Sequence, residues 1–156
     1  MPNIQLKDPD GGANIEAQGD NYKIISDGAA NDSDKTFTVP AGKTWKLDHI
    51  RFSFATTAVA GTRQMRIELG NGAAVFWFKN FGATQIESLT RTYYAAADLP
   101  DDAAFNSAGQ IRMWLLDRVL LPGYTVRIYD VNAFAPTTDD MVEGILVDER
   151  DVGTRV

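Results

Sequence analysis

The chain has 156 residues, of which 44% are hydrophobic, and this length and composition are typical of one globular domain with its own core. It contains no cysteine, which excludes disulfides, thiolate metal sites and a cysteine nucleophile. Its formal net charge is −6, and because an acidic surface repels phosphate backbones we expect no nucleic-acid partner.

Residues 1–20 are polar and rich in glycine, aspartate and asparagine, and we interpret them as an extended N-terminal arm. They lack the apolar run of a signal peptide, and no segment of the sequence is apolar enough to span a bilayer. We therefore predict no membrane partner and synthesis in a cytoplasm. A β-sandwich domain is expected over 21–150, followed by a C-terminal tail over 151–156.

Short alternating runs separated by Gly, Pro, Asn and Asp fill the rest of the chain, a pattern typical of β-strands. We expect strands, in chain order, at 22–26, 36–39, 44–55, 63–69, 73–79, 85–94, 111–117, 124–130 and 141–149. About eight or nine such strands predict an all-β, antiparallel β-sandwich. The long connections, above all 95–109, favour a jelly roll over an up-and-down barrel.

The longest predicted strand changes phase in its middle. Trp45 and Leu47 have one parity along the chain, whereas Ile50 has the other. A regular strand cannot turn both sets toward the core, because its side chains alternate strictly between two faces. We therefore predict a β-bulge, with one extra residue, near Asp48 and His49.

Alternating residues predict that the strand at 63–69 is buried on one face, and the turn at 70–72 joins it to 73–79 as a hairpin. The second strand of this hairpin is apolar on both faces: Val75 and Trp77 alternate with Phe76 and Phe78. A strand that is apolar on both sides is covered on both sides. One cover is the domain core, and the other is a loop or another subunit.

Six arginines lie inside predicted strands, where we interpret them as solvated strand faces or as interface contacts: Arg51, Arg63, Arg66, Arg91, Arg112 and Arg127.

The sequence carries no catalytic or cofactor motif. His49 is the only histidine, no serine lies in a nucleophile elbow, and neither Gly-rich phosphate motif is present. Acidic residues gather in three groups whose spacing does not match an EF-hand, so we interpret them as solvated loops: Asp27/Asp32/Asp34, Asp101/Asp102 and Asp139/Asp140. We therefore expect a protein that is not an enzyme and that holds no cofactor or metal.

Four segments together resemble small virion proteins of tailed bacteriophages: FTVPAGKTWKLDHIRFSF, the hairpin TRQMRIEL…VFWF, SLTRTYYAAADLPDDAAF and LLPGYTVRIYD. The resemblance covers roughly residues 36–149 and points to capsid decoration, or cement, proteins, which are typically jelly-roll domains. It implies a homotrimer that binds the phage major capsid protein at junctions between capsomers. It also implies a place on the capsid exterior of the virion, where the protein stabilises the shell.

On this interpretation, contacts with other subunits or with the capsid come from the arm and from two strands: Ile4, Leu6, Phe76, Trp77, Phe78, Arg91, Tyr93 and Tyr94. An alternative is a carbohydrate-binding β-sandwich of a phage fibre or host-attachment protein. In that case Trp45, Trp77 and Trp114 form a platform for a sugar ring.

Overall fold

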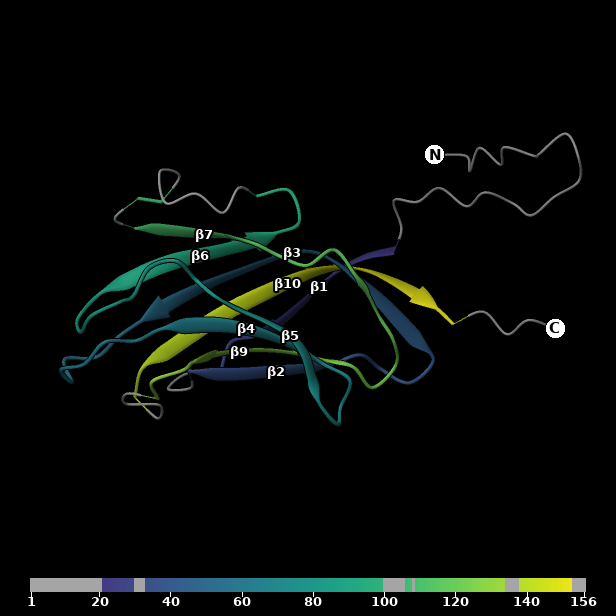
Figure 1. Ribbon diagram of the computed structural model, residues 1–156, viewed down its shortest axis with the longest axis horizontal. Helices are drawn as coiled ribbons and strands as arrows, with labels where there is room; N and C mark the ends of the chain where they lie inside the picture. Colours follow the sequence, from purple (N-terminus) through teal and green to yellow (C-terminus); the bar gives the residue numbers. More distant parts are fainter. Residues whose placement is uncertain (1–20, 30–32, 100–105, 108, 134–137, 153–156) are drawn as a thin grey trace, which may run out of the picture.

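A computed structural model describes residues 21–29, 33–99, 106–107, 109–133 and 138–152, which form two packed β-sheets (Figure 1). The predicted N-terminal arm, with Ile4 and Leu6, lies outside the described residues. So does the predicted tail beyond Val152.

The described residues form strands with the following bounds: β1 (Tyr22–Asp27), β2 (Asp34–Thr38), β3 (Lys43–Ala55), β4 (Met65–Gly70), β5 (Val75–Asn80), β6 (Thr90–Ala96), β7 (Gln110–Trp114), β8 (Val119–Leu120), β9 (Thr125–Asp130) and β10 (Asp140–Asp151). One sheet has the order β1-β10-β3-β6-β7, with β8 also paired to β3. The other sheet has the order β2-β9-β4-β5. The all-β sandwich predicted from the sequence is confirmed.

Strand pairing is nested in the manner of a jelly roll. β1 pairs with β10, β2 with β9, β3 with β6 and β4 with β5, so from β1 to β4 each successive strand pairs with a partner that comes earlier in the chain. Four of these eight strands lie in each sheet, as in two interlocked Greek keys. β7 and β8 are additions to this plan.

One pair departs from the predicted antiparallel arrangement. β7 lies parallel to β6, with Tyr93 paired to Ile111 and Ala95 to Met113. Parallel neighbours need a crossover connection that returns the chain to its starting end. The long connection predicted at 95–109 has the length for this crossover.

The core lies between the two sheets and follows the predicted alternation. Met65, Ile67 and Leu69 of β4 expose none of their surface, whereas Arg66 and Glu68 between them are only partly buried. On the core side of the six-stranded sheet, the Phe52 ring of β3 stacks on the ring of Tyr93, its cross-strand partner in β6, with a centroid separation of 4.7 Å.

The predicted β-bulge in β3 is confirmed. Leu146 of β10 pairs with His49 and Val147 pairs with Leu47, so Asp48 is the extra residue. Asp48 and His49 are both exposed, while Leu47 and Ile50 on either side are buried. The bulge therefore lets both halves of this long strand turn their apolar side chains inward.

The strand expected over 85–94 begins only at Thr90. Gln85 instead forms an isolated bridge with Arg63, and Ser88 adopts a positive φ of 56°. The buried amide of Gln85 donates to the carbonyl oxygens of Phe54 and Leu89, at 3.0 and 2.9 Å. Between Gln85 and Thr90 the chain is therefore held by one isolated bridge and by side-chain hydrogen bonds, not by a continuous strand ladder.

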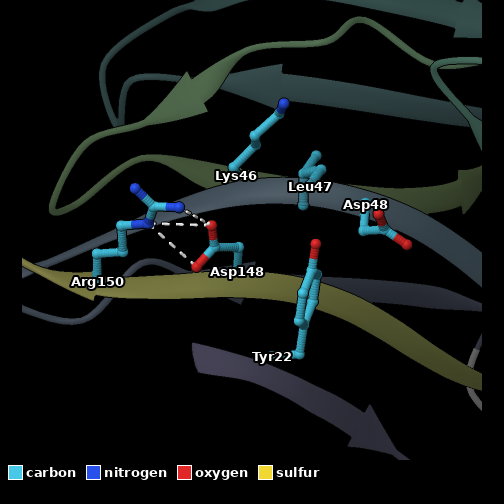
Figure 2. Close-up of a pocket in the computed structure, with 6 residues that line it drawn as sticks. All are labelled: Tyr22, Lys46, Leu47, Asp48, Asp148 and Arg150. Atoms are coloured by element: carbon cyan, nitrogen blue, oxygen red, sulfur yellow. Dashed lines mark hydrogen bonds and ion pairs between the residues drawn. The ribbon is translucent and has the colours of Figure 1, made fainter. Parts of the chain in front are cut away.

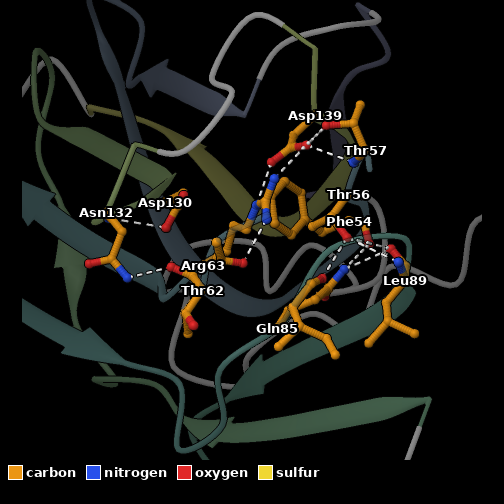
Figure 3. Close-up of polar contacts among 12 residues, drawn as sticks. Phe54, Thr56, Thr57, Thr62, Arg63, Gln85, Leu89, Asp130, Asn132 and Asp139 are labelled. Carbon is orange, nitrogen blue, oxygen red and sulfur yellow. Dashed lines mark hydrogen bonds and ion pairs between the residues drawn. The ribbon is translucent and has the colours of Figure 1, made fainter. Parts of the chain in front are cut away.

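Loops at one end of the sandwich are joined by a buried polar network (Figure 3). Arg63 Nε lies 2.8 Å from Asp139 Oδ2, and the two side chains are fully buried. Asp139 Oδ1 also accepts hydrogen bonds from the backbone N–H and the hydroxyl of Thr57, both at 2.8 Å. The interpretation of Arg63 as a solvated or interface arginine was wrong, because its guanidinium serves as a core cross-link.

Candidate interaction surfaces

The three aromatic residues predicted to contact a partner from β5 have different environments. Phe76 is half-buried, with its ring centroid 5.6 Å from that of Tyr124. Trp77 is half-buried and packs edge-to-face on Trp114, with centroids 6.2 Å apart. Phe78 is 57% exposed. Phe76 and Trp77 thus both pack against the core, with Phe76 as the extra residue at an irregularity in the β4–β5 pairing, and of the three only Phe78 is largely open.

The three predicted interface residues of β6 are also divided by side-chain alternation. Tyr93 points into the core and exposes 0% of its surface, so its assignment to an interface is corrected. Tyr94 points to the opposite face, half-buried, with the Arg51 guanidinium 5.9 Å from its ring centroid. Arg91 is half-buried and donates to the Thr84 carbonyl oxygen at 2.6 Å.

Phe78 belongs to a cluster on the outer side of the four-stranded sheet, which we call the aromatic–arginine face and define as Arg66, Phe78, Arg127 and Tyr129. The strand register brings these residues together, because Arg66 pairs with Tyr129 while Glu68 pairs with both Arg127 and Phe78. Their neighbours along the strands, such as Ile67 and Ile128, are buried on the core side.

Hydrogen bonds hold both arginines of this face in place. Arg66 Nε donates to Asn80 Oδ1 at 2.7 Å, and its guanidinium carbon lies 4.5 Å from the Phe78 ring centroid. Arg127 Nε donates to Asp34 Oδ1 at 2.8 Å, and its guanidinium carbon lies 4.1 Å from the Tyr129 ring centroid. Such contacts fix the orientation of side chains that would otherwise rotate in solvent.

Protonation on this face is well defined at neutral pH. Partial burial, followed by the hydrogen bond from its hydroxyl to Glu68, raises the pKa of Tyr129 above its usual value. The hydrogen bond to Asp34 raises the pKa of Arg127 further above its usual value. The face therefore presents the neutral phenol of Tyr129 beside the charged guanidinium of Arg127.

A second exposed apolar group lies on the outer side of the six-stranded sheet. Tyr22, Ile24 and Val142 are 54%, 72% and 51% exposed. Ile24 lies over Gly144, where an added Cβ would come within 3.7 Å of its Cγ2 atom. We call these three side chains the β1–β10 row, and β1 is the edge strand of its sheet in the described part of the chain.

The bulge in β3 borders a charged surface hollow of about 310 Å³, lined by Tyr22, Lys46, Leu47, Asp48, Asp148 and Arg150 (Figure 2). Arg150 Nη2 donates to Asp148 Oδ2 at 2.6 Å, so part of the charge in this hollow is paired. The hollow has two carboxylates and two cations, and no nucleophile paired with a base lines it.

The residues considered for chemistry have structural or surface roles where they are described. His49 Nδ1 lies 3.0 Å from Asp48 Oδ2 on the surface. Asp27 accepts a hydrogen bond from the Ala29 backbone, and Asp34 pairs with Arg127. Asp32, Asp101 and Asp102 lie outside the described residues. Within the described ranges, no group of three His, Cys, Asp or Glu side chains could hold a metal ion, and no helix could cross a membrane.

The tryptophans do not form the platform that carbohydrate binding would require. Trp45 is 2% exposed and donates its indole N–H to Glu149 Oε2 at 2.7 Å. Trp77 and Trp114 pack against each other, as described above. A sugar platform needs aromatic faces open to solvent, so these residues do not favour the carbohydrate-binding alternative.

Comparison with known proteins gives little further information. No family model matches the sequence, and no curated protein matches it. The fold is weakly similar to a chain in the structure of infectious bursal disease virus, Gx strain, with a TM-score of 0.29 and 16% sequence identity. The match covers 99% of this chain and 42% of the viral chain, so this protein spans less than half of that chain's length.

Proposed function

We propose that this protein is a non-enzymatic structural protein of a tailed-bacteriophage virion. In this role it binds the outer capsid surface at junctions between capsomers and stabilises the shell. The sequence resemblance to decoration proteins and the jelly-roll strand order support the proposal. The observation that carries it is the aromatic–arginine face on the outer side of the four-stranded sheet.

The composition of this face suits a protein–protein contact. Phe, Tyr and Arg are enriched at the centres of interfaces, where they contribute most of the binding energy. Phe78 is 57% exposed and would lose water contact on binding. Arg66 and Arg127 are already oriented by Asn80 and Asp34, so little side-chain freedom would be lost when a partner docks.

On a repeating shell, each individual contact can also have a low affinity. Subunits that are joined to one another bind a lattice at several points, and the second attachment is effectively intramolecular. One modest face per subunit is then sufficient for stable decoration. We further propose that the functional unit is a homotrimer and that its other partner is the major capsid protein.

The test is co-sedimentation of the purified protein with phage shells that lack it. We expect Phe78→Ala and Arg66→Ala to weaken shell binding, Phe78→Ala by at least about tenfold, since burying a phenylalanine is worth about 1.5–3 kcal/mol. Val142→Ala is the matched control, because Val142 is an exposed apolar residue on the other sheet. Loss of binding in the Val142 variant alone, or no binding by the unaltered protein, would contradict the proposal.

A further inference from the structure

One end of the sandwich is formed by three segments that contain no charged residue, although the exposed Arg118 directly precedes the third and lies 4.8 Å from the Phe76 ring centroid. The segments 39–42, 70–75 and 119–124 read VPAG, GNGAAV and VLLPGY. Three of their large apolar side chains are about half exposed: Val75 (52%), Val119 (49%) and Leu121 (48%). Val152, 49% exposed, lies beside the first of these segments, since its N–H donates to the Gly42 carbonyl oxygen at 2.8 Å. We call these three segments and Val152 the uncharged turn end.

Backbone contacts connect the turns of this end to one another. The Val39 N–H donates to the Tyr124 carbonyl oxygen at 2.8 Å, and the Gly123 N–H donates to the Val39 carbonyl oxygen at 2.9 Å. At Gly72, where φ is +84°, a Cβ would lie 3.1 Å from the Gly123 carbonyl oxygen, so the backbones of these two turns are close. The exposed apolar side chains therefore stand on a fixed framework.

The β4–β5 turn is also stabilised internally. The side-chain oxygen of Asn71 accepts hydrogen bonds from the backbone N–H groups of Ala73 and Ala74, at 3.0 and 2.7 Å. A turn held in this way needs no ordering when a partner docks, which removes part of the entropic cost of binding.

We infer that the uncharged turn end is the surface through which copies of this chain contact one another. The chain carries a net charge of −6, so most pairs of its surfaces would repel each other. A surface that meets its own copies must be neutral or self-complementary. The three segments of the turn end carry no charge, and at its rim Lys43 Nζ pairs with Asp151 Oδ1 at 2.6 Å. The remaining charge at the rim is Arg118, whose guanidinium lies over the Phe76 ring, and a single cation does not repel an acidic copy of the chain.

The position of this end also fits a division of roles between surfaces. The turns lie at an end of the sandwich (Figure 1). The aromatic–arginine face, by contrast, covers the outer side of a sheet. Copies joined through their turn ends would leave that sheet face open to a shell. The inference rests on the proposed function for this second contact, and it names the self-contact that a homotrimer requires.

The experiment measures molar mass by light scattering after size-exclusion chromatography, over a series of micromolar concentrations. We expect the unaltered protein to be an oligomer, and Val75→Asp and Leu121→Asp each to raise its dissociation constant at least about tenfold. The matched control is Val142→Asp, which adds the same charge at a valine of similar exposure on β10 and should leave the mass unchanged. Circular dichroism confirms that each variant is folded.

Three outcomes would overturn the inference: a monomeric unaltered protein, dissociation by Val142→Asp to the same extent, or turn variants that lose shell binding while keeping the oligomer mass. The failure of the proposed function looks different. An oligomer that the turn substitutions dissociate, but that does not co-sediment with shells, would retain the self-contact and refute the role on the capsid.

Discussion

Arg63 and Asp139 form an ion pair from which water is excluded, with 2.8 Å between Nε and Oδ2 and no exposed surface on either side chain. The pair joins the loop before β4 to the loop before β10, 76 residues later in the chain. Its remaining hydrogen-bonding capacity is also used, since Arg63 donates to the Gly61 carbonyl oxygen and Asp139 accepts from Thr57. The ion pair therefore holds these two loops together at the end of the sandwich where the buried polar network lies.

Replacement of Asp139 by alanine should lower the free energy of unfolding by about 3–5 kcal/mol, because it leaves the Arg63 charge buried without its carboxylate. Urea denaturation followed by fluorescence measures this loss. The control is the double variant Arg63→Met/Asp139→Leu, which removes both charges and should recover a large part of the stability. A single variant as stable as the unaltered protein would show that water reaches the guanidinium.

Deletion of Asp48 should lower the free energy of unfolding by at least about 3 kcal/mol. Without the extra residue, β3 alternates strictly, and either Trp45 and Leu47 or the side chains beyond the bulge must turn away from the core. Asp48→Ala keeps the residue count and is the control, with little expected loss. Thermal unfolding of the two variants makes the comparison, and equal midpoints would mean that the bulge does not set the phase.

Stability should fall as the pH rises above 10. Burial raises the pKa of Tyr93 from 10.0 to about 12, so the unfolded chain releases this proton first. The stabilisation is complete below the unfolded pKa of 10.0 and is lost progressively between 10 and about 12, by about 2–3 kcal/mol in total. Denaturation at a series of pH values measures it.

Tyr93→Phe is the control for this pH dependence. The variant should be less stable at neutral pH, because it removes the hydrogen bond from the Tyr93 hydroxyl to Gln85 Oε1, which is 2.9 Å long. Above pH 10 its stability should change less than that of the unaltered protein. An identical decline in both proteins would assign the effect to other groups.

Two glycine substitutions should separate backbone strain from contact between turns. Gly42 has a φ of +75° and no atom within 4 Å of an added Cβ, so Gly42→Ala should cost about 1 kcal/mol from strain alone. At Gly72 the φ is +84° and the Gly123 carbonyl oxygen would lie 3.1 Å away, so Gly72→Ala should cost more. Thermal unfolding measures both, and equal costs would indicate that the two turns move independently.

Apolar alternation was sufficient to predict much of this fold. It placed Met65, Ile67 and Leu69 in the core, and the phase change after Leu47 located the bulge at Asp48. These features are local, since side-chain direction along a strand follows from sequence parity. The jelly-roll order was favoured by the long connections alone, and pairing of distant strands such as β1 with β10 established it.

Features that depend on distant partners could not be read from the sequence. Tyr93 and Tyr94 are adjacent and identical, so their sequence does not decide which of them faces the core. Arg63 has the same parity along the chain as the core residues that follow it in β4. Its charge can be buried only because it pairs with Asp139, which the sequence does not show. Phe78 was predicted to be an interface residue, and Arg66 and Arg127 to be solvated or interface arginines. The sequence did not show that these residues and Tyr129 form one face, because the register of three strands brings them together.

The pairing of β1 with β10 has a mechanical consequence. Tyr22, at the start of β1, pairs with Asp148 near the end of β10, so the described chain enters and leaves the sandwich at the same end (Figure 1). A pulling force applied between Tyr22 and Val152 would open this antiparallel ladder like a zipper, one hydrogen bond after another, instead of shearing all of them together. The protein should therefore yield at low force when stretched through these two points, and a load-bearing role would require attachment elsewhere on its surface.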